Sequence, residues 1–244
     1  MKQLYSKLES LINDSTLFQE LLGKECVFPF TKETRVLAYL LHNNFITFDQ
    51  YDAISNEYAE RNKYLLLFDM APRTFGETWG ENHILKLFPK FSKATKESLA
   101  KDYPGFDGEF DLWLNGIRVE VKACRANSQD AGKSLASRAY LHEEAVANGF
   151  KYHYQQLKPS CCDVFIWIGV CRDKLIYWVL TSDELKDTGK LGSQHRNENT
   201  GNEDTEVFEG QVFMTEKELS SFAVKEVDVL NKVIEKGTKS NPNN

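Results

Sequence analysis

The stretch DLWLNGIRVEVK, residues 111–122, decides the fold of this chain. Within it, Asn115-Gly116 lies between alternating apolar residues, and this dipeptide is the strongest short-range signal of a two-residue hairpin turn. The turn fixes the register of two antiparallel strands. We therefore expect Asp111 to lie opposite Glu120, and Glu109 opposite Lys122.

The two faces of this predicted hairpin differ in chemistry. Side chains alternate between the faces of a strand, so one face is wholly apolar and must be buried. It consists of Phe110, Leu112, Leu114, Ile117, Val119 and Val121. On the other face two carboxylates lie about 5 Å apart, and such like-charged pairs are destabilising. A divalent cation bound through carboxylate oxygens would offset this repulsion, although a surface hairpin with a ladder of salt bridges also fits.

The pattern around the hairpin mixes helices and strands. Helical spacing dominates residues 1–70, where Thr47 and Gln50 predict a capping box. After the hairpin we expect a helical segment ending before Pro159. Further expected elements are a helix over 77–88, strands near 90–95, 162–171, 175–181 and 210–215, capping boxes at Thr181–Glu184 and Thr215–Glu218, and a polar loop over 186–206.

These elements predict an α/β fold with a central mixed sheet flanked by helices. We expect three parts along the chain. Residues 1–72 form a helical region that resembles a helix-turn-helix unit able to contact DNA, and Pro72 marks its end. Residues 73–235 form the core with its recognition loops. Residues 236–244 form a disordered tail.

Composition narrows the class of protein. The chain is 41% hydrophobic and 27% charged, as is typical of globular proteins, and no apolar stretch approaches the roughly 20 residues that span a bilayer. We expect a cytoplasmic protein without membrane contact.

The five cysteines do not form a zinc-binding pattern. A net charge of −6 excludes a purely electrostatic nucleic-acid binder, but basic runs at 86–101 and 122–138 flank the hairpin.

The residues Asp111 and Glu120-Val121-Lys122 resemble the PD-(D/E)xK nuclease superfamily. In that superfamily an acid begins one strand, and an acid-x-Lys motif follows on its hairpin partner. The resemblance covers roughly residues 75–180 and implies a restriction-endonuclease-like core. Phe110 stands where the family has proline, and Asp107 is a lesser candidate for the first acid. Within the superfamily the chain most resembles a type II restriction endonuclease.

The resemblance implies a role for each residue of the motif. Asp111, Glu120 and the Val121 carbonyl would bind Mg²⁺, and Lys122 would orient or activate the attacking water. A carboxylate from the preceding helix, Glu81 in preference to Glu77, would assist. The implied reaction is hydrolysis of double-stranded DNA to leave 5′-phosphates. The genetic partner would be a DNA methyltransferase, and both a monomer and a homodimer stay open.

DNA contacts are expected from basic and amide side chains near the motif and in the polar loop. The candidates are Lys93, Lys96, Arg125, Lys133, Arg138, Gln155, Gln194, Arg196 and Asn197. His83 and His153 are weaker candidates for proton carriers.

Other functions fit the same sequence. A repair or junction-resolving nuclease could use the same core. A non-catalytic DNA-binding module and a purely structural hairpin are the two alternatives outside enzymology.

Overall fold

The computed structural model describes residues 2–12, 14–23, 32–130, 132–193 and 209–240. The chain divides into two compact units, residues 1–62 and 63–244. The sequence prediction placed this boundary ten residues later, at Pro72. The difference arises because Phe68, in the short helix η1 (Leu65–Phe68), is buried in the core of the second unit.

The first unit is helical, as predicted. It contains α1 (Lys2–Ile12), α2 (Ser15–Gly23), α3 (Lys32–His42) and α4 (Phe48–Arg61). The capping box at Thr47 and Gln50 is confirmed at the start of α4. The helices enclose a small apolar core that includes Leu8, Phe18 and Leu40. None of the described helices of either unit is long and apolar enough to cross a membrane.

The second unit contains a mixed six-stranded sheet, which confirms an α/β fold with flanking helices. Its strand order is β1-β2-β3-β5-β6-β9, with β3 and β5 parallel and the other neighbours antiparallel. The strands are β1 (Ser92–Lys93), β2 (Leu112–Leu114), β3 (Ile117–Arg125), β5 (Val164–Val170), β6 (Leu175–Thr181) and β9 (Ala223–Val224).

The hairpin of β2 and β3 has the predicted register over its regular part. Leu112 pairs with Val119 and Leu114 with Ile117, around a turn in which both Asn115 and Gly116 have positive φ. Regular pairing ends at Leu112. Beyond it the chain bends, so Phe110 packs with Trp113 on the opposite side of the sheet from Leu112. The prediction that Phe110 shares the face of Leu112 was wrong for this reason.

The helical segment predicted before Pro159 is only partly helical. After α6 (Leu135–Arg138) and α7 (His142–Ala147), the chain forms β4 (Lys151–Leu157). This strand belongs to a second sheet, of order β4-β8-β7, with β7 (Gly192–Ser193) and β8 (Gly210–Thr215). Tyr152, Tyr154 and Leu157 of β4 are buried, so tertiary packing selects the strand.

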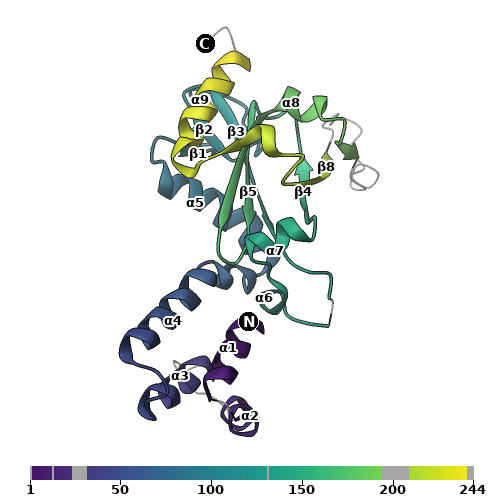
Figure 1. Ribbon diagram of the computed structural model, residues 1–244. Helices are drawn as coiled ribbons and strands as arrows, with labels where there is room; N and C mark the ends of the chain where they lie inside the picture. The colour runs from purple at the N-terminus through teal and green to yellow at the C-terminus, as the bar shows by residue number, and fades with distance from the viewer. Residues whose placement is uncertain (1, 13, 24–31, 131, 194–208, 241–244) are drawn as a thin grey trace. The chain divides into compact units, whose positions relative to one another are not determined.

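Each face of the six-stranded sheet has its own apolar core. On one face, α5 (Gly80–Leu87), the preceding π-helix η2 (Thr74–Trp79) and α9 (Val229–Ser240) pack against β3, β5 and β6. On the other face lie β4, β8 and α8 (Ser182–Asp187), whose apolar residues meet Phe165, Trp167 and Trp178. Figure 1 shows α5 and α9 on one side of β5 and the second sheet on the other.

The C-terminal helix is longer than predicted. Residues 236–240, expected in a disordered tail, complete α9. Lys236 is 8% exposed and its ammonium donates to both oxygens of Glu184, in the confirmed capping box of α8. This ion pair ties the end of α9 to α8.

Gly169 of β5 leaves room for the side chains of Trp178 and Tyr152. A Cβ at this position would lie 2.7 Å from both Trp178 and Tyr152 side chains. We expect Gly169→Ala to lower the free energy of unfolding by about 1–3 kcal/mol, because an over-packed core must shift. Denaturant unfolding measures this, and Gly192→Ala, with its nearest neighbour at 3.8 Å, is the control. Equal stability of the two variants would contradict the expectation.

Candidate active site

Two charged side chains of β3 form the centre of the candidate site. Alternation along the strand places Glu120 and Lys122 on one face, opposite the buried Val119 and Val121. Glu120 is only 5% exposed, and the Lys122 ammonium forms an ion pair with its carboxylate. A buried ionic pair of this kind carries a desolvation cost, which makes it an uncommon feature of a purely structural strand.

Asp111 lies just beyond the end of β2, where the hairpin ladder stops. Its backbone N–H donates to the Val119 carbonyl, and its carboxylate accepts a 2.8 Å hydrogen bond from the Val121 N–H. The regular register does not extend to Asp111, which corrects the prediction of a direct pair with Glu120. The carboxylate instead bonds to the backbone of β3, and its charge acts on Glu120.

Glu81 reaches the same place from helix α5. Gly80 brings the helix close to β3, since a Cβ there would lie 3.6 Å from the Ala123 and Val121 side chains. Glu81 is 9% exposed and forms a 2.9 Å ion pair with Lys93 of β1. Thus the helix carboxylate preferred from the sequence lies beside the hairpin. Nothing is described for the side chain of Glu77.

The charges of the cluster are shaped by burial and by their closeness to one another. Burial raises the pKa values of Glu81, Asp111 and Glu120, and the Asp111 charge raises those of the other two further. Burial also disfavours the charged form of Lys122, but Glu120 and Asp111 outweigh it and raise the lysine pKa. Lys122 is therefore a protonated group that donates hydrogen bonds, and it is not a base.

Two members of the cluster were missed in the sequence. Lys158, in the loop after β4, lies close enough to affect the charges of both Asp111 and Glu120. Cys162 lies in the same loop and interacts with Lys122 and Glu120. Burial raises the pKa of this thiol well above its usual range, so it is neutral and a poor nucleophile. Both residues follow β4, the strand that the sequence prediction did not contain.

The carboxylates do not form a closed set of metal ligands. Among the described residues, no three histidine, cysteine or acidic side chains converge tightly enough to hold an ion. Lys122 and Lys93 lie against Glu120 and Glu81 and take the place that a cation would fill. The available donors are carboxylate oxygens, the type that Mg²⁺ prefers.

The other predicted DNA contacts are spread over the second unit. Lys96 and Lys133 pair with the acids Asp107 and Asp130, all on the surface. Asp107 thus lies in an exposed ion pair, whereas Asp111 lies within the cluster. The Arg138 guanidinium donates to the Ser128 carbonyl.

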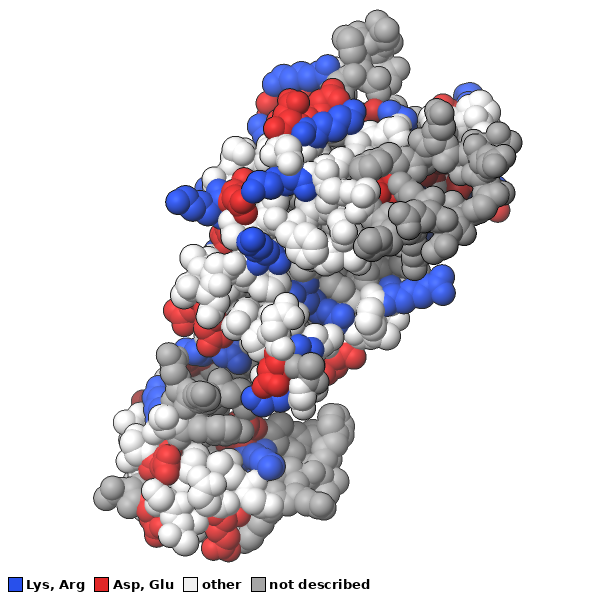
Figure 2. Space-filling model, turned by 90° about the vertical axis from the view of Figure 1, so that its right-hand side faces the viewer, with Lys and Arg blue, Asp and Glu red and all other residues white. Residues whose placement is uncertain are grey.

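Arg125 and Gln155, both predicted to contact DNA, lie in surroundings that the sequence did not predict. Arg125 donates to the carbonyls of Leu67, Phe68 and Met70 and covers the Phe75 ring, which anchors residues 67–70. Gln155 is exposed on β4 and does not end a helix. Gln194, Arg196 and Asn197 fall outside the described residues. In the coloured part of Figure 2, basic and acidic side chains are interspersed and form no continuous basic patch.

The two histidines lie away from the carboxylate cluster. His153 on β4 bonds to Gln211 and stacks on Phe213. His83 on α5 lies 2.7 Å from the Tyr177 hydroxyl, which donates in turn to Glu226. The Tyr177 hydroxyl has a single hydrogen, which it donates to Glu226. The hydrogen in the bond between His83 and Tyr177 therefore belongs to His83 Nε2.

Burial lowers the pKa of His83 below its usual 6.5, more than Glu226 raises it. The unfolded chain therefore binds a proton that the folded chain does not, as the pH falls through this value. We expect this contribution to stability to be complete above about pH 6.5 and to be lost as the pH falls below it. Urea unfolding of the wild type and of His83→Phe at several pH values measures it. An unchanged pH dependence in the variant would contradict the expectation.

Comparison with known proteins adds no family assignment. No family model matches the chain, and neither a curated protein nor a solved structure is significantly similar to it. Any function must therefore be argued from the cluster itself.

Proposed function

We propose that this chain is a Mg²⁺-dependent endonuclease that cuts double-stranded DNA at a specific sequence and leaves 5′-phosphates, as the nuclease of a type II restriction–modification system. The observation that carries the proposal is the cluster of Asp111, Lys122 and the buried Glu120, with the buried Glu81 beside it. Asp111 and the motif Glu120-Val121-Lys122 are close in the sequence, and they also lie in contact in the fold. Bringing these like charges together at a poorly solvated site costs stability, and that cost is explained if the cluster has a function.

The order of elements supports a restriction-endonuclease-like core. An acid-bearing helix, α5, precedes the hairpin, and helices α6 and α7 follow it. Two apolar strands, β5 and β6, then complete the sheet, with β5 parallel to the strand that carries Glu120 and Lys122. This is the sequence of elements that the family resemblance requires.

The residues present fit Mg²⁺ in their chemistry. Asp111 and Glu120 would hold it, with the Val121 carbonyl and Glu81 assisting, because all four supply hard oxygen donors. Burial is the main cause of the raised pKa values of Glu81, Asp111 and Glu120, and repulsion from Asp111 adds to it at Glu81 and Glu120; a bound cation would stabilise the charged form of all three. When bound, Mg²⁺ polarises the phosphodiester and lowers the pKa of water.

Two lysines supply the positive charge that phosphate chemistry needs. Lys122 stays protonated, so its N–H groups can stabilise negative charge that develops on the phosphate and orient the attacking water. Lys158, whose side chain is 29% exposed and lies 3.7 Å from the Glu209 carboxylate, can exchange this partner for a phosphate oxygen.

Incubation with plasmid and phage DNA, in Mg²⁺ and in EDTA, tests the proposal. We expect discrete fragments with 5′-phosphate ends in Mg²⁺ and intact DNA in EDTA. Cleavage of branched or damaged substrates alone would indicate a repair nuclease instead. The absence of cleavage of any DNA form with Mg²⁺, Mn²⁺ or Ca²⁺ would overturn the proposal.

A further inference from the structure

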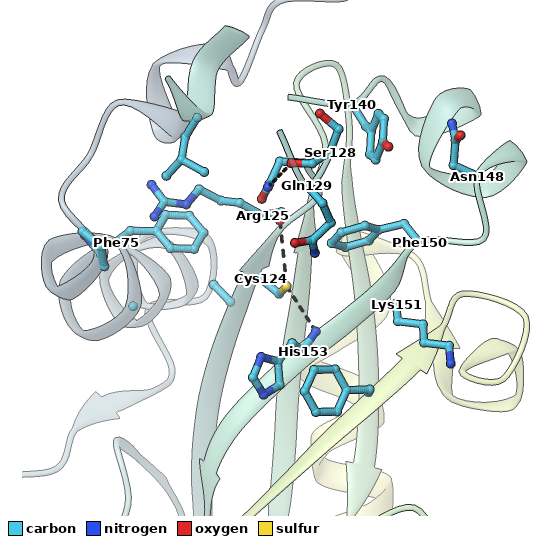
Figure 3. Close-up of a pocket in the computed structure, with 16 residues that line it drawn as sticks. Phe75, Cys124, Arg125, Ser128, Gln129, Tyr140, Asn148, Phe150, Lys151 and His153 are labelled. Carbon is cyan, nitrogen blue, oxygen red and sulfur yellow. Dashed lines mark hydrogen bonds between the residues drawn. The ribbon is translucent and has the colours of Figure 1, made fainter. Parts of the chain in front are cut away.

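A second feature lies beside the cluster, at the carboxyl end of β3. It is a hollow of about 670 Å³ lined by residues of η2, the end of β3, the chain around α6 and α7, and the strands β4 and β8. Figure 3 shows Gln129 and Phe150 next to one another above Cys124, with His153 below. A concave site of this size, with aromatic walls and a few polar groups, is typical of ligand pockets.

The aromatic wall is rigid and open to solvent. His153 and Phe213 stack with ring centroids 3.8 Å apart, and the Gln211 amide holds His153 at 3.0 Å. Phe213 is nevertheless 50% exposed. A half-exposed phenyl ring fixed on a strand exposes apolar surface that a flat ligand can cover by stacking.

The polar groups of the hollow suit the edge of a nucleobase. The Gln129 amide offers both a donor and an acceptor, which match the hydrogen-bonding groups of a base. The Asn127 amide nitrogen donates to the Ser128 carbonyl at 3.0 Å, and its oxygen remains as an acceptor. Lys151 at the rim is exposed, and among the described residues it has no ion-pair partner, so it can meet a phosphate. Arg125 also lines the hollow, but it stacks on Phe75 and its guanidinium already donates to backbone carbonyls.

The hollow and the cluster share one strand. Glu120, Lys122 and Cys124 follow each other on the same face of β3, so Cys124 lies about 7 Å beyond Lys122. At Cys124, the thiol accepts a 3.3 Å hydrogen bond from the His153 backbone N–H, and at the other end of β4 Lys158 approaches Glu120. The two strands therefore lead from the pocket to the carboxylates.

We infer that this hollow binds one nucleobase that has left the base stack of the DNA, next to the phosphate held at Lys122. The inference rests on the proposed nuclease function and names a feature of its substrate. A paired base lies inside the duplex and cannot enter a pocket walled by Phe150 on one side and His153 on another. An extruded base can stack on Phe213 and bond through its freed edge.

The test compares two duplexes in EDTA, where binding is measured without cleavage. One carries a single unpaired adenine, and the other carries an abasic residue at the same position. By fluorescence anisotropy we expect the adenine to improve the affinity about tenfold, as stacking of one base on an aromatic ring does. Phe213→Ala should remove this difference. Phe48→Ala, another exposed phenylalanine but in the first unit, should preserve it.

A photochemical cross-link gives the position directly. With 5-iodouracil in place of the unpaired adenine, we expect attachment to the peptides that contain Phe150 or Phe213. Equal affinity for the two duplexes, a preference that survives Phe213→Ala, or a cross-link elsewhere would overturn the inference. Tight binding of free adenosine monophosphate without any difference between the duplexes would also overturn it. Because no step requires cleavage, a base preference in a protein that cuts no DNA refutes the nuclease proposal alone.

Discussion

Glu120→Gln and Lys122→Ala are each expected to slow Mg²⁺-dependent DNA cleavage at least about a hundredfold, while DNA binding in EDTA changes little. Each substitution removes one full charge from the buried cluster. In the proposed mechanism Glu120→Gln removes the charge of a Mg²⁺ ligand, and Lys122→Ala removes the donor that would face negative charge on the phosphate. Under the proposed function both interactions would gain strength in the transition state, so the rate should fall more than the affinity. Single-turnover cleavage of a defined duplex measures the rate.

Controls separate chemistry from folding. Lys186→Ala and Asp183→Asn break an exposed ion pair on α8 and should change the rate by no more than about twofold. The double variant Glu120→Gln/Lys122→Met removes both charges of the ion pair together, so it should fold better than either single variant and still be inactive. Folded single variants that cut at the wild-type rate would place the active site elsewhere.

Local sequence signals predicted the hairpin and its motif because they depend on few residues. The turn at Asn115-Gly116 determines the pairing of Leu112 with Val119 without help from the rest of the chain. The continuous apolar runs of β5 and β6 likewise indicate strands buried on both faces. The capping boxes at Thr47 and Thr181 depend only on the spacing of two side chains.

The errors come from interactions between distant segments. Strand β4 comes directly after α7, and the sequence prediction continued the helix through it. The alternation of Tyr152 and Tyr154 was the period-two signal that could have identified the strand. Its pairing with β8 lies some 60 residues away in sequence. Lys158 and Cys162 were not predicted as members of the site, because only the return of the chain after β4 brings them to the cluster.

The bend at Asp111 shows the same limit on a smaller scale. Alternation of side chains predicts that Asp111 continues the ladder, but the strand stops at Leu112. The aromatic group of Tyr103, Phe106, Phe110 and Trp113 pulls Phe110 to the other face. A buried aromatic side chain contributes more free energy than one additional ladder hydrogen bond, so packing determines the path of the chain.

Asp163→Ala is expected to cause the largest loss of stability of any single substitution considered for this chain, about 3–5 kcal/mol. Asp163 precedes β5 and its side chain is 6% exposed. Its carboxylate accepts from the Arg118 backbone N–H at 2.8 Å and from two guanidinium nitrogens at 3.2 and 2.6 Å. Removing it leaves the Arg118 N–H without its acceptor and leaves the partly buried guanidinium with Tyr103 but no counter-charge, where the parallel pairing of β3 and β5 begins.

The matched variants separate the charge from the hydrogen bonds. Asp163→Asn keeps an acceptor for the Arg118 N–H and should lose less stability than Asp163→Ala. Arg118→Met/Asp163→Leu replaces the pair by apolar side chains and should recover much of the loss. Urea unfolding, followed by circular dichroism, gives the three free energies. Because Glu120 lies two residues after Arg118 on β3, slackening of this pairing should also reduce DNA cleavage in Asp163→Ala. An Asp163→Ala protein as stable as the wild type would show that the pairing of β3 with β5 does not depend on this ion pair.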